Sequence, residues 1–287
     1  GACFSALSSI WDKYVFQVAA APKERAKTVV AVPLAGEPFV FDGVFRRDYW
    51  TKWGVSINNG YRDIFTGGVF PRQSELILTA DAENLYLAVL HPVPPGGIVC
   101  NQKVHDSQVW LDECVELDVN PVAEDLNPRH MYQIVSNFRG VTYDIDNDLA
   151  IGQFYKEWTC KGYEAKRARK EQEEKGRDDY VLIIRLPFKS VGIADPTQPF
   201  GINLGRGFAN PTEFASLQGA SFNDPKTLVR CRVLKGAPAI SWKLNDPDGE
   251  GRYRVDLSVR GGTLGGKDRR PLLVRHREPH RAEDLGR

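Results

Sequence analysis

Alternating apolar and polar residues mark the stretch 109–120 as a β-strand with two different faces. Successive side chains of a strand point to opposite sides of a sheet. One side is mainly apolar and consists of Val109, Leu111, Glu113, Val115, Leu117 and Val119. The other begins with an aromatic residue and continues with Asp112, Cys114, Glu116 and Asp118 after Trp110. The apolar side predicts a buried face, and Glu113 is expected near the start of the strand, where solvent reaches it.

Similar short apolar runs recur along the chain and are separated by turn residues. Asp81-Ala82-Glu83-Asn84 and Arg139-Gly140 each stand between two such runs and predict hairpins. The stretch 205–225 looks irregular. The predicted strands are residues 28–34, 39–41, 76–80, 85–90, 132–138, 141–145, 180–186, 200–204, 228–234 and 252–259.

Only the segment 165–175 has a helical composition, rich in Lys, Arg and Glu with almost no apolar stripe. Such a segment is typical of a solvated excursion between strands. Many short strands with frequent turns predict an all-β protein. The fold class is therefore an antiparallel β-sandwich, jelly-roll-like, with one short charged helical insertion.

Composition changes suggest three parts: a lead-in at 1–36, the sandwich at 37–235, and a remainder at 236–287. The remainder is expected to hold a β-hairpin-like start of a further domain and a disordered basic tail. From Arg252 onward there are 10 basic and 5 acidic residues, so the rest of the chain has a net charge of −4. A mildly acidic body argues against a nucleic-acid-binding surface.

The five cysteines show no zinc-ligand spacing. A Cys100–Cys160 disulfide is one option that the sequence leaves open. Gly1-Ala2-Cys3 would fit the end of a bacterial lipoprotein signal, with Cys3 lipidated, if Leu preceded it. No run of 18 apolar residues predicts a membrane span.

Seven short motifs, taken in order, resemble the family 9 carbohydrate-binding modules and the wider DOMON-like β-sandwiches. The resemblance covers about residues 37–234. The motifs are Phe41-Asp42-Gly43 with Trp50, Asp81 with Leu85-Tyr86-Leu87, Asp106 with Trp110 and Val115-Glu116-Leu117, Tyr132-Gln133 with Asn137, Gly140 and Tyr143-Asp144, Ile184-Arg185-Leu186-Pro187-Phe188, Gly201-Ile202-Asn203, and Ser221-Phe222-Asn223-Asp224-Pro225.

The resemblance implies a sugar held between two aromatic rings, with polar side chains of the sheet as hydrogen-bonding partners. Trp110 matches the first ring and Phe222 the second. Glu116 matches the sugar-binding carboxylate and Asn137 a polar position on the neighbouring strand. Gln133 shares a strand face with Asn137 by the two-residue period.

Three positions depart from the family pattern. Phe222 stands in place of a Trp and offers a smaller stacking surface. Val135 replaces a basic residue that sugar-binding members can carry, which removes a charged donor. Ile183 stands where the family often has Glu. The fold therefore transfers more fully than the ligand.

Each site residue also has a purely structural interpretation. Trp110 and Phe222 could pack against sheet edges. Glu116 could form an ion pair with Arg185 or Arg206, and Asn137 could satisfy a turn. A sandwich with a structural or interaction role and no sugar site is therefore the alternative function.

Asp144, Asp146 and Asp148 alternate at a spacing that suits oxygen ligation of calcium. A solvated strand end is the other interpretation. No cofactor is required, and calcium is the candidate metal. A haem site, the third option, would use Met131 with His91, His105 or His130 as axial ligands.

Catalysis is not expected. Glu113 and Glu116 point to opposite faces of one strand and cannot flank a glycosidic bond, and no nucleophile motif is present. The predicted function is non-catalytic binding of a poly- or oligosaccharide by an accessory module of a larger glycan-degrading polypeptide. The expected location is extracellular or in the cell envelope.

Overall fold

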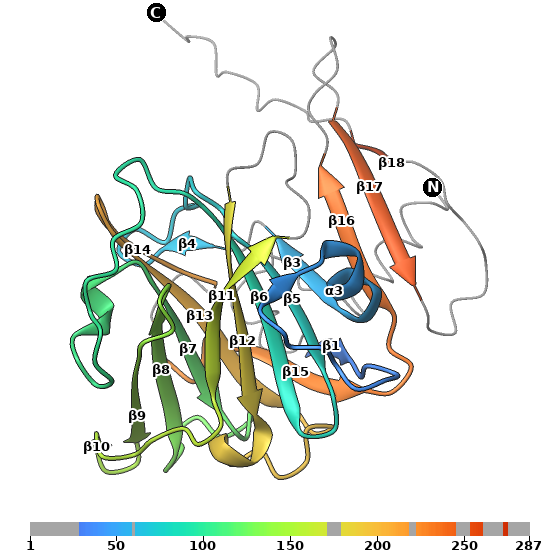
Figure 1. Ribbon diagram of the computed structural model, residues 1–287. Coiled ribbons are helices and arrows are strands. Elements are labelled where there is room, and N and C mark those ends of the chain that lie inside the picture. The colour runs from blue at the N-terminus through green and yellow to red at the C-terminus, as the bar shows by residue number, and fades with distance from the viewer. Residues whose placement is uncertain are drawn as a thin grey trace, which may run out of the picture.

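The computed structural model describes residues 29–58, 61–170, 179–217, 222–244, 253–260 and 272–274. Most of these residues form strands, arranged in two large packed sheets and one small sheet (Figure 1). In this part of the chain, no helix is both long and apolar enough to cross a membrane. The predicted all-β sandwich is confirmed.

The first sheet has the strand order β1-β15-β13-β7-β8-β9-β10, and β14 joins β13 to β4. All of its pairings are antiparallel except that of β1 with β15. Its strands are β1 (Val29–Pro33), β4 (Arg62–Asp63), β7 (Cys114–Asn120), β8 (Met131–Asn137), β9 (Thr142–Asp148), β10 (Gln153–Tyr155), β13 (Phe200–Ala209), β14 (Thr212–Ser216) and β15 (Val229–Leu234).

The second sheet has the order β2-β11-β12-β6-β5-β3. The predicted hairpin between β5 and β6 forms because the Asp81 carboxylate accepts the backbone N–H groups of Glu83 and Asn84, at 2.8 and 2.7 Å. The strands are β2 (Val44–Phe45), β3 (Val55–Asn58), β5 (Glu75–Ala80), β6 (Asn84–Pro92), β11 (Glu164–Lys170) and β12 (Asp179–Pro187).

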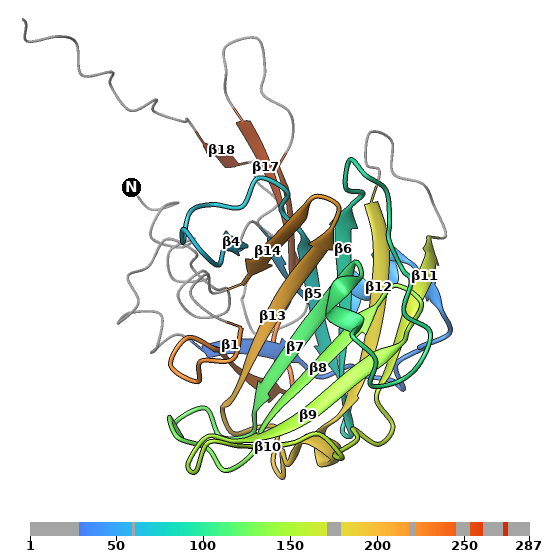
Figure 2. The ribbon, with the colours of Figure 1, turned by 90° about the vertical axis from the view of Figure 1, so that its left-hand side faces the viewer.

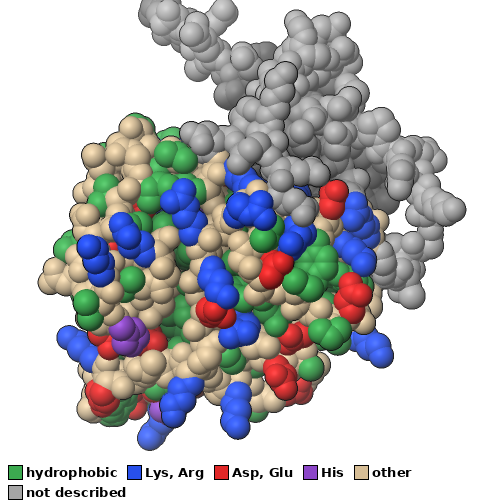
Figure 3. All heavy atoms as spheres, in the orientation of Figure 1, with side chains coloured by type: hydrophobic (Ala, Val, Ile, Leu, Met, Phe, Trp, Pro, Cys, Tyr) green, Lys and Arg blue, Asp and Glu red, His purple; other side chains and the backbone are tan. Residues whose placement is uncertain are grey.

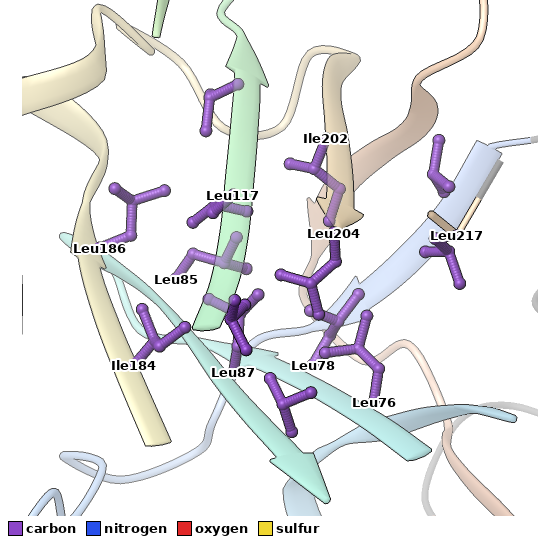
Figure 4. Close-up of a cluster of buried hydrophobic side chains, with 14 of the residues drawn as sticks. Leu76, Leu78, Leu85, Leu87, Leu117, Ile184, Leu186, Ile202, Leu204 and Leu217 are labelled. Carbon is purple, nitrogen blue, oxygen red and sulfur yellow. The ribbon is translucent and has the colours of Figure 1, made fainter. Parts of the chain in front are cut away.

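The main core lies between the two large sheets (Figure 4). Leu117 and Leu204 of the first sheet meet Leu87, Leu78 and Ile184 of the second, and all five are fully buried. Burying a leucine side chain stabilises the fold by about 1.5–3 kcal/mol, so this layer accounts for much of the stability of the sandwich.

A second apolar cluster covers the other side of the second sheet. Helix α3 (Arg47–Trp53) and the segment before it place Trp50, Phe39 and Phe45 against Ile77 and Ile183. Ile183, one of the three departures from the family pattern, is therefore a packing residue. Apolar clusters therefore cover both faces of the second sheet.

The charged segment 165–175 is not helical in its described part. It forms β11, which pairs antiparallel with β12, and the helix of the described chain is α3 instead. Ala165 and Ala168 supply the buried positions of this strand. The segment 39–41, expected as a strand, has no strand partner, and part of the stretch 205–225 expected to be irregular continues β13 and forms β14.

Strand β1 lies in the segment expected as a lead-in and pairs with β15. In the remainder, β16 (Ala239–Leu244) pairs with β17 (Tyr253–Arg260), and β17 pairs with β18 (Leu272–Val274). Ile240 of β16 joins the main core. Cys3 and most of the expected basic tail lie outside the described residues.

The cysteines of the described chain, Cys100, Cys114, Cys160 and Cys231, are all unpaired, so the Cys100–Cys160 disulfide is not formed. On the face drawn in Figure 3, basic side chains are scattered rather than gathered in one patch, and several have acidic neighbours. The pairing of Glu164 with both Lys166 and Arg185 is one example.

Candidate functional site

The stretch 109–120 is a strand only in its second part. Val109–Leu111 forms a 3₁₀ turn, η1, and β7 begins at Cys114. Trp110 therefore precedes the strand and is 41% exposed. Figure 2 shows η1 over the side of the first sheet that faces away from the core, at the start of β7. The predicted core face of β7 is confirmed, with Val115, Leu117 and Val119 all buried.

Glu113 lies in the interior, so its expected exposure to solvent is wrong. Its Oε2 is 3.3 Å from Nη2 of Arg206 on β13, and the two side chains are 0% and 1% exposed. Tyr180 donates a hydrogen bond to the same oxygen at 3.3 Å, and the Ala209 N–H donates to Oε1 at 2.8 Å. The Arg206 guanidinium also lies 3.8 Å from the centre of the Phe208 ring. This carboxylate is therefore a structural anchor between β7 and β13.

Two more carboxylates lie on the opposite side of β7, called here the outer face of the first sheet. Glu116 and Asp118 are 8% and 0% exposed. Gln133 of β8 donates a hydrogen bond to Glu116 at 2.6 Å. Within the described chain, neither oxygen of Asp118 accepts a hydrogen bond. Burial raises the pKa of Glu116 to about 7, and burial together with the charge of Glu116 raises the pKa of Asp118 well above its ordinary value.

Neither of the cations considered as partners of Glu116 reaches it. Arg206 pairs with Glu113, and Arg185 pairs with Glu164 at 3.0 Å. Among the described residues, no ion pair involves Glu116 or Asp118. Buried charges are normally paired. Within the described chain, Glu116 and Asp118 both lack a cationic partner, and Asp118 also lacks a hydrogen-bond donor.

Aromatic side chains stand on both sides of these carboxylates. The strand register places Tyr143, Val135, Glu116 and Gly205 in one row across β9, β8, β7 and β13. Three strand spacings separate the ends of this row, about 14 Å. Trp110 packs edge-on against Tyr143, with ring centres 5.0 Å apart. At the opposite end, the Phe222 ring lies over Gly205.

Phe222 is held by its backbone and by the absence of a side chain beneath it. Asn203 of β13 donates a hydrogen bond to the Phe222 carbonyl at 2.8 Å. A Cβ added to Gly205 would stand 2.7 Å from Cδ1 of that ring. Gly205 therefore marks where the Phe222 ring approaches β13 closely, and Gly207 marks the close approach of the Cys114 sulfur. In the sequence these glycines stand two residues apart, as alternate positions of a strand do, but a glycine-containing stretch is also typical of irregular structure.

The structure brings together Trp110, Glu116, Gln133 and Phe222 from the predicted site, and adds Asp118 and Tyr143. Asn137 has a different role. Its amide nitrogen donates to Gln102 O and Asp112 Oδ2, at 3.1 and 2.8 Å. Its oxygen accepts the N–H groups of Arg139 and Val141, both at 3.0 Å. The hydrogen bond to a sugar expected of Asn137 has no donor or acceptor left to form it.

The three aspartates proposed for calcium do not converge in the described structure. Asp144 accepts the Cys160 N–H at 2.8 Å, Asp146 pairs with His130 at 2.8 Å, and Asp148 accepts the Ala150 N–H at 3.1 Å. The cluster that could hold a metal among the described residues combines Asp144 with His105 and Asp106 instead.

The haem alternative requires the side chains of Met131 and a histidine to point into one cavity, where they could bind the iron from opposite faces of the haem. Met131 alternates with the core residues Tyr132 and Ile134 and so faces the outer side of the first sheet. His91, which is fully buried, packs on the inner side against Tyr180. His105 and His130 contact carboxylates of β9 that share the inner side. The sheet itself separates the methionine from these histidines.

No family model matches the chain, and no curated protein matches it in sequence. Among solved structures, a candidate carbohydrate-binding protein from Bacteroides uniformis ATCC 8492 is similar, with a TM-score of 0.54 and 12% identity over 72% of this chain and 98% of that one. A family 9 carbohydrate-binding module from Caldicellulosiruptor kristjanssonii in complex with cellotriose has a TM-score of 0.46 and 13% identity, over 72% of this chain and 94% of that one. The complex of such a module with glucose gives a TM-score of 0.46 and 12% identity, over 73% and 97% of the two chains.

At this level of identity, the match to the Bacteroides uniformis protein concerns the fold. It confirms the expected resemblance to a carbohydrate-binding-module-like β-sandwich, and it covers nearly all of that protein's length. What this chain binds has to be argued from its own residues.

Proposed function

We propose that this protein binds carbohydrate without cleaving it, on the outer face of the first sheet between Trp110 and Phe222. One observation carries the proposal: Glu116 and Asp118 are buried acceptors with no cationic partner in the described chain, and they lie between aromatic rings. The shared sandwich fold with a candidate carbohydrate-binding protein supports it.

Sugar hydroxyls suit this arrangement because they both donate and accept hydrogen bonds, and a carboxyl group accepts them when ionised and can also donate one when protonated. A hydrogen bond to a charged group contributes about 1.5–3 kcal/mol to binding when the site is dry. The C–H faces of a sugar ring would contact the Trp110 and Phe222 rings, whose flat apolar surfaces favour such stacking. Gln133, which is hydrogen-bonded to Glu116, supplies a further polar group on the outer face of the first sheet.

The positions of the carboxylates favour binding over hydrolysis. Glycosidases place an acid and a nucleophile or base on either side of the scissile bond. Glu116 and Asp118 both rise from β7, so they approach a bound sugar from the same side. Glu113, the remaining carboxylate of this stretch, is committed to Arg206 on the inner face.

The proposal extends to an accessory role in a larger glycan-degrading polypeptide, outside the cell or in its envelope. Shallow sites of this kind bind with modest affinity, because many of their hydrogen bonds replace those to water. Tethering to a catalytic domain raises the effective concentration of the glycan at that domain.

Glycan-array binding of the full chain tests the proposal. Trp110→Ala should weaken binding at least about tenfold through lost ring contact. Phe41→Ala removes an aromatic residue from the outer side of the other sheet and should leave binding unchanged. Absence of glycan binding by the unsubstituted protein would favour the purely structural or interaction role. Equal binding by wild type and Trp110→Ala would contradict the proposed site.

A further inference from the structure

A second cluster of polar side chains lies on the inner side of β9, close in sequence to Trp110 and Tyr143. His105 Nε2 is 3.3 Å from Asp106 Oδ2 and 3.5 Å from Asp144 Oδ1. One potential ligand atom from each residue lies within 4.8 Å of the other two. The cluster therefore brings one imidazole nitrogen and two carboxylate oxygens to a common point.

Asp144 distinguishes this cluster from an ordinary acidic surface patch. The residue is 2% exposed, and its Oδ2 accepts the Cys160 N–H at 2.8 Å. Its Oδ1 is also buried, yet in the described part of the chain it accepts no hydrogen bond and points at His105. A buried carboxylate oxygen without a donor costs free energy unless a cation is present.

The imidazole is oriented by its other nitrogen. His105 Nδ1 lies 3.0 Å from the Thr142 hydroxyl, which leaves Nε2 directed at the two aspartates. Metal-binding histidines are commonly fixed by such a hydrogen bond on the ring nitrogen that does not bind the metal. The Asp106 N–H donates to the Thr142 carbonyl at 2.9 Å, which holds the loop against β9.

We propose that His105, Asp106 and Asp144 bind a divalent first-row transition metal, zinc in particular, with water completing its coordination. Ligand atoms about 2.0–2.1 Å from a tetrahedral zinc ion are about 3.3–3.4 Å apart. The spacings of 3.3 and 3.5 Å around His105 Nε2 match that value. Calcium is disfavoured here because it takes six to eight oxygen ligands at longer distances.

The metal would connect the loop that carries Trp110 to the strand that carries Tyr143. Asp106 lies four residues before Trp110, and Asp144 directly follows Tyr143. The ion would therefore hold Trp110 and Tyr143, the aromatic pair at one end of the outer-face site, from the other side of β9. This consequence rests on the proposed function, whereas metal binding itself does not.

Calorimetric titration of the metal-stripped full chain with zinc chloride tests the site. We expect one zinc per chain, and His105→Ala and Asp106→Asn should each weaken binding at least about tenfold. His130→Ala is the matched control, because His130 pairs with Asp146 at 2.8 Å on the same strand but belongs to no three-residue cluster in the described chain. It should bind zinc as the wild type does.

Cobalt substitution identifies the ligands independently, since a cysteine thiolate bound to cobalt gives an intense charge-transfer band and nitrogen or oxygen ligands do not. We expect no such band. Absence of zinc binding, binding unchanged in His105→Ala, a thiolate band, or calcium bound as tightly as zinc would each overturn the proposal. Because none of these measurements uses a glycan, their failure is distinct from failure of the sugar site.

Discussion

Glu113 and Glu116 are three residues apart, are both buried, and have opposite environments. Glu113 faces Arg206, Tyr180 and the Ala209 N–H on the inner face. Glu116 faces outward beside Asp118, with Gln133 as its hydrogen-bond donor. The first carboxylate has its counter-charge within the fold, whereas the second shares its surroundings with another carboxylate.

This difference distinguishes Glu113, a carboxylate with a structural role, from Glu116, a carboxylate available to bind a ligand. Glu113 is paired with a cation inside the fold and both of its oxygens accept hydrogen bonds, so this carboxylate needs no partner from outside the protein. Burial raises the pKa of both outer carboxylates, and the charge of Glu116 raises the pKa of Asp118 further, so ionising the pair is unfavourable. A ligand that donates hydrogen bonds would relieve it, so we associate the outer pair with binding.

The largest effect is expected at the inner carboxylate. Arg206→Met should lower the free energy of unfolding by about 3–5 kcal/mol, because it leaves Glu113 buried without a cation. Urea denaturation measures this loss. The double variant Glu113→Gln with Arg206→Met should recover much of it, since both charges are then gone. Equal instability of the single and double variants would mean that the ion pair is not the cause.

At the outer face, stability should depend on pH in the direction opposite to that of an ordinary paired carboxylate. Burial raises the folded-state pKa of Glu116 to about 7, above its ordinary value of 4.5. The folded protein therefore binds the proton more tightly, and the free energy of unfolding falls as the pH rises from about 4.5 to 7. The fall is on the order of 2–3 kcal/mol. Denaturation at pH 5, 6, 7 and 8 should show it, with a flatter profile in Glu116→Gln.

Asp118→Asn should separate stability from binding. Removing a buried charge without a partner should raise the free energy of unfolding by about 1 kcal/mol at pH 7. The same change should weaken glycan binding several-fold, because the outer face loses a carboxylate that can accept hydrogen bonds. Paired denaturation and titration experiments measure both quantities. A variant that loses stability and keeps its glycan affinity would mean that Asp118 has a structural role and no role in binding.

The smallest effect is expected at Gly205. In Gly205→Ala the new methyl group would meet the Phe222 ring at 2.7 Å and displace it. Glycan affinity should fall a few-fold, while stability changes by less than about 1 kcal/mol. Gly68→Ala, whose closest contact would be the Thr66 hydroxyl at 3.3 Å, is the control and should bind normally.

The parts of the fold that depend on local patterns could be predicted from the sequence. The hairpin at Asp81 and the core face of β7 follow from turn chemistry and a two-residue period. Segment 165–175 was misinterpreted because Lys, Glu, Arg and Ala favour helices in isolation. Its described part is β11, which lies next to the two-residue strand β2 at the end of the second sheet. Charged residues are common on such outlying strands because they discourage edge-to-edge aggregation.

The site could be predicted only in part, because its residues are defined by contacts distant in sequence. Trp110, Glu116 and Phe222 came from resemblance to a family. Arg206, 93 residues after Glu113, could not be assigned to one carboxylate rather than another by spacing. Asn137 was misassigned because two of its four side-chain hydrogen bonds go to Gln102 and Asp112, which are distant in sequence.

Strand β13 has a practical consequence for protein engineering. Its even-numbered residues Ile202, Leu204 and Arg206 secure the interior, while Asn203 and Gly205 hold Phe222 outside. Because alternate positions contribute to different faces, substitutions at 203 and 205 would change the position of Phe222 rather than the packing of the interior residues. The strand thus offers a compact place from which the selectivity of the proposed sugar site can be changed.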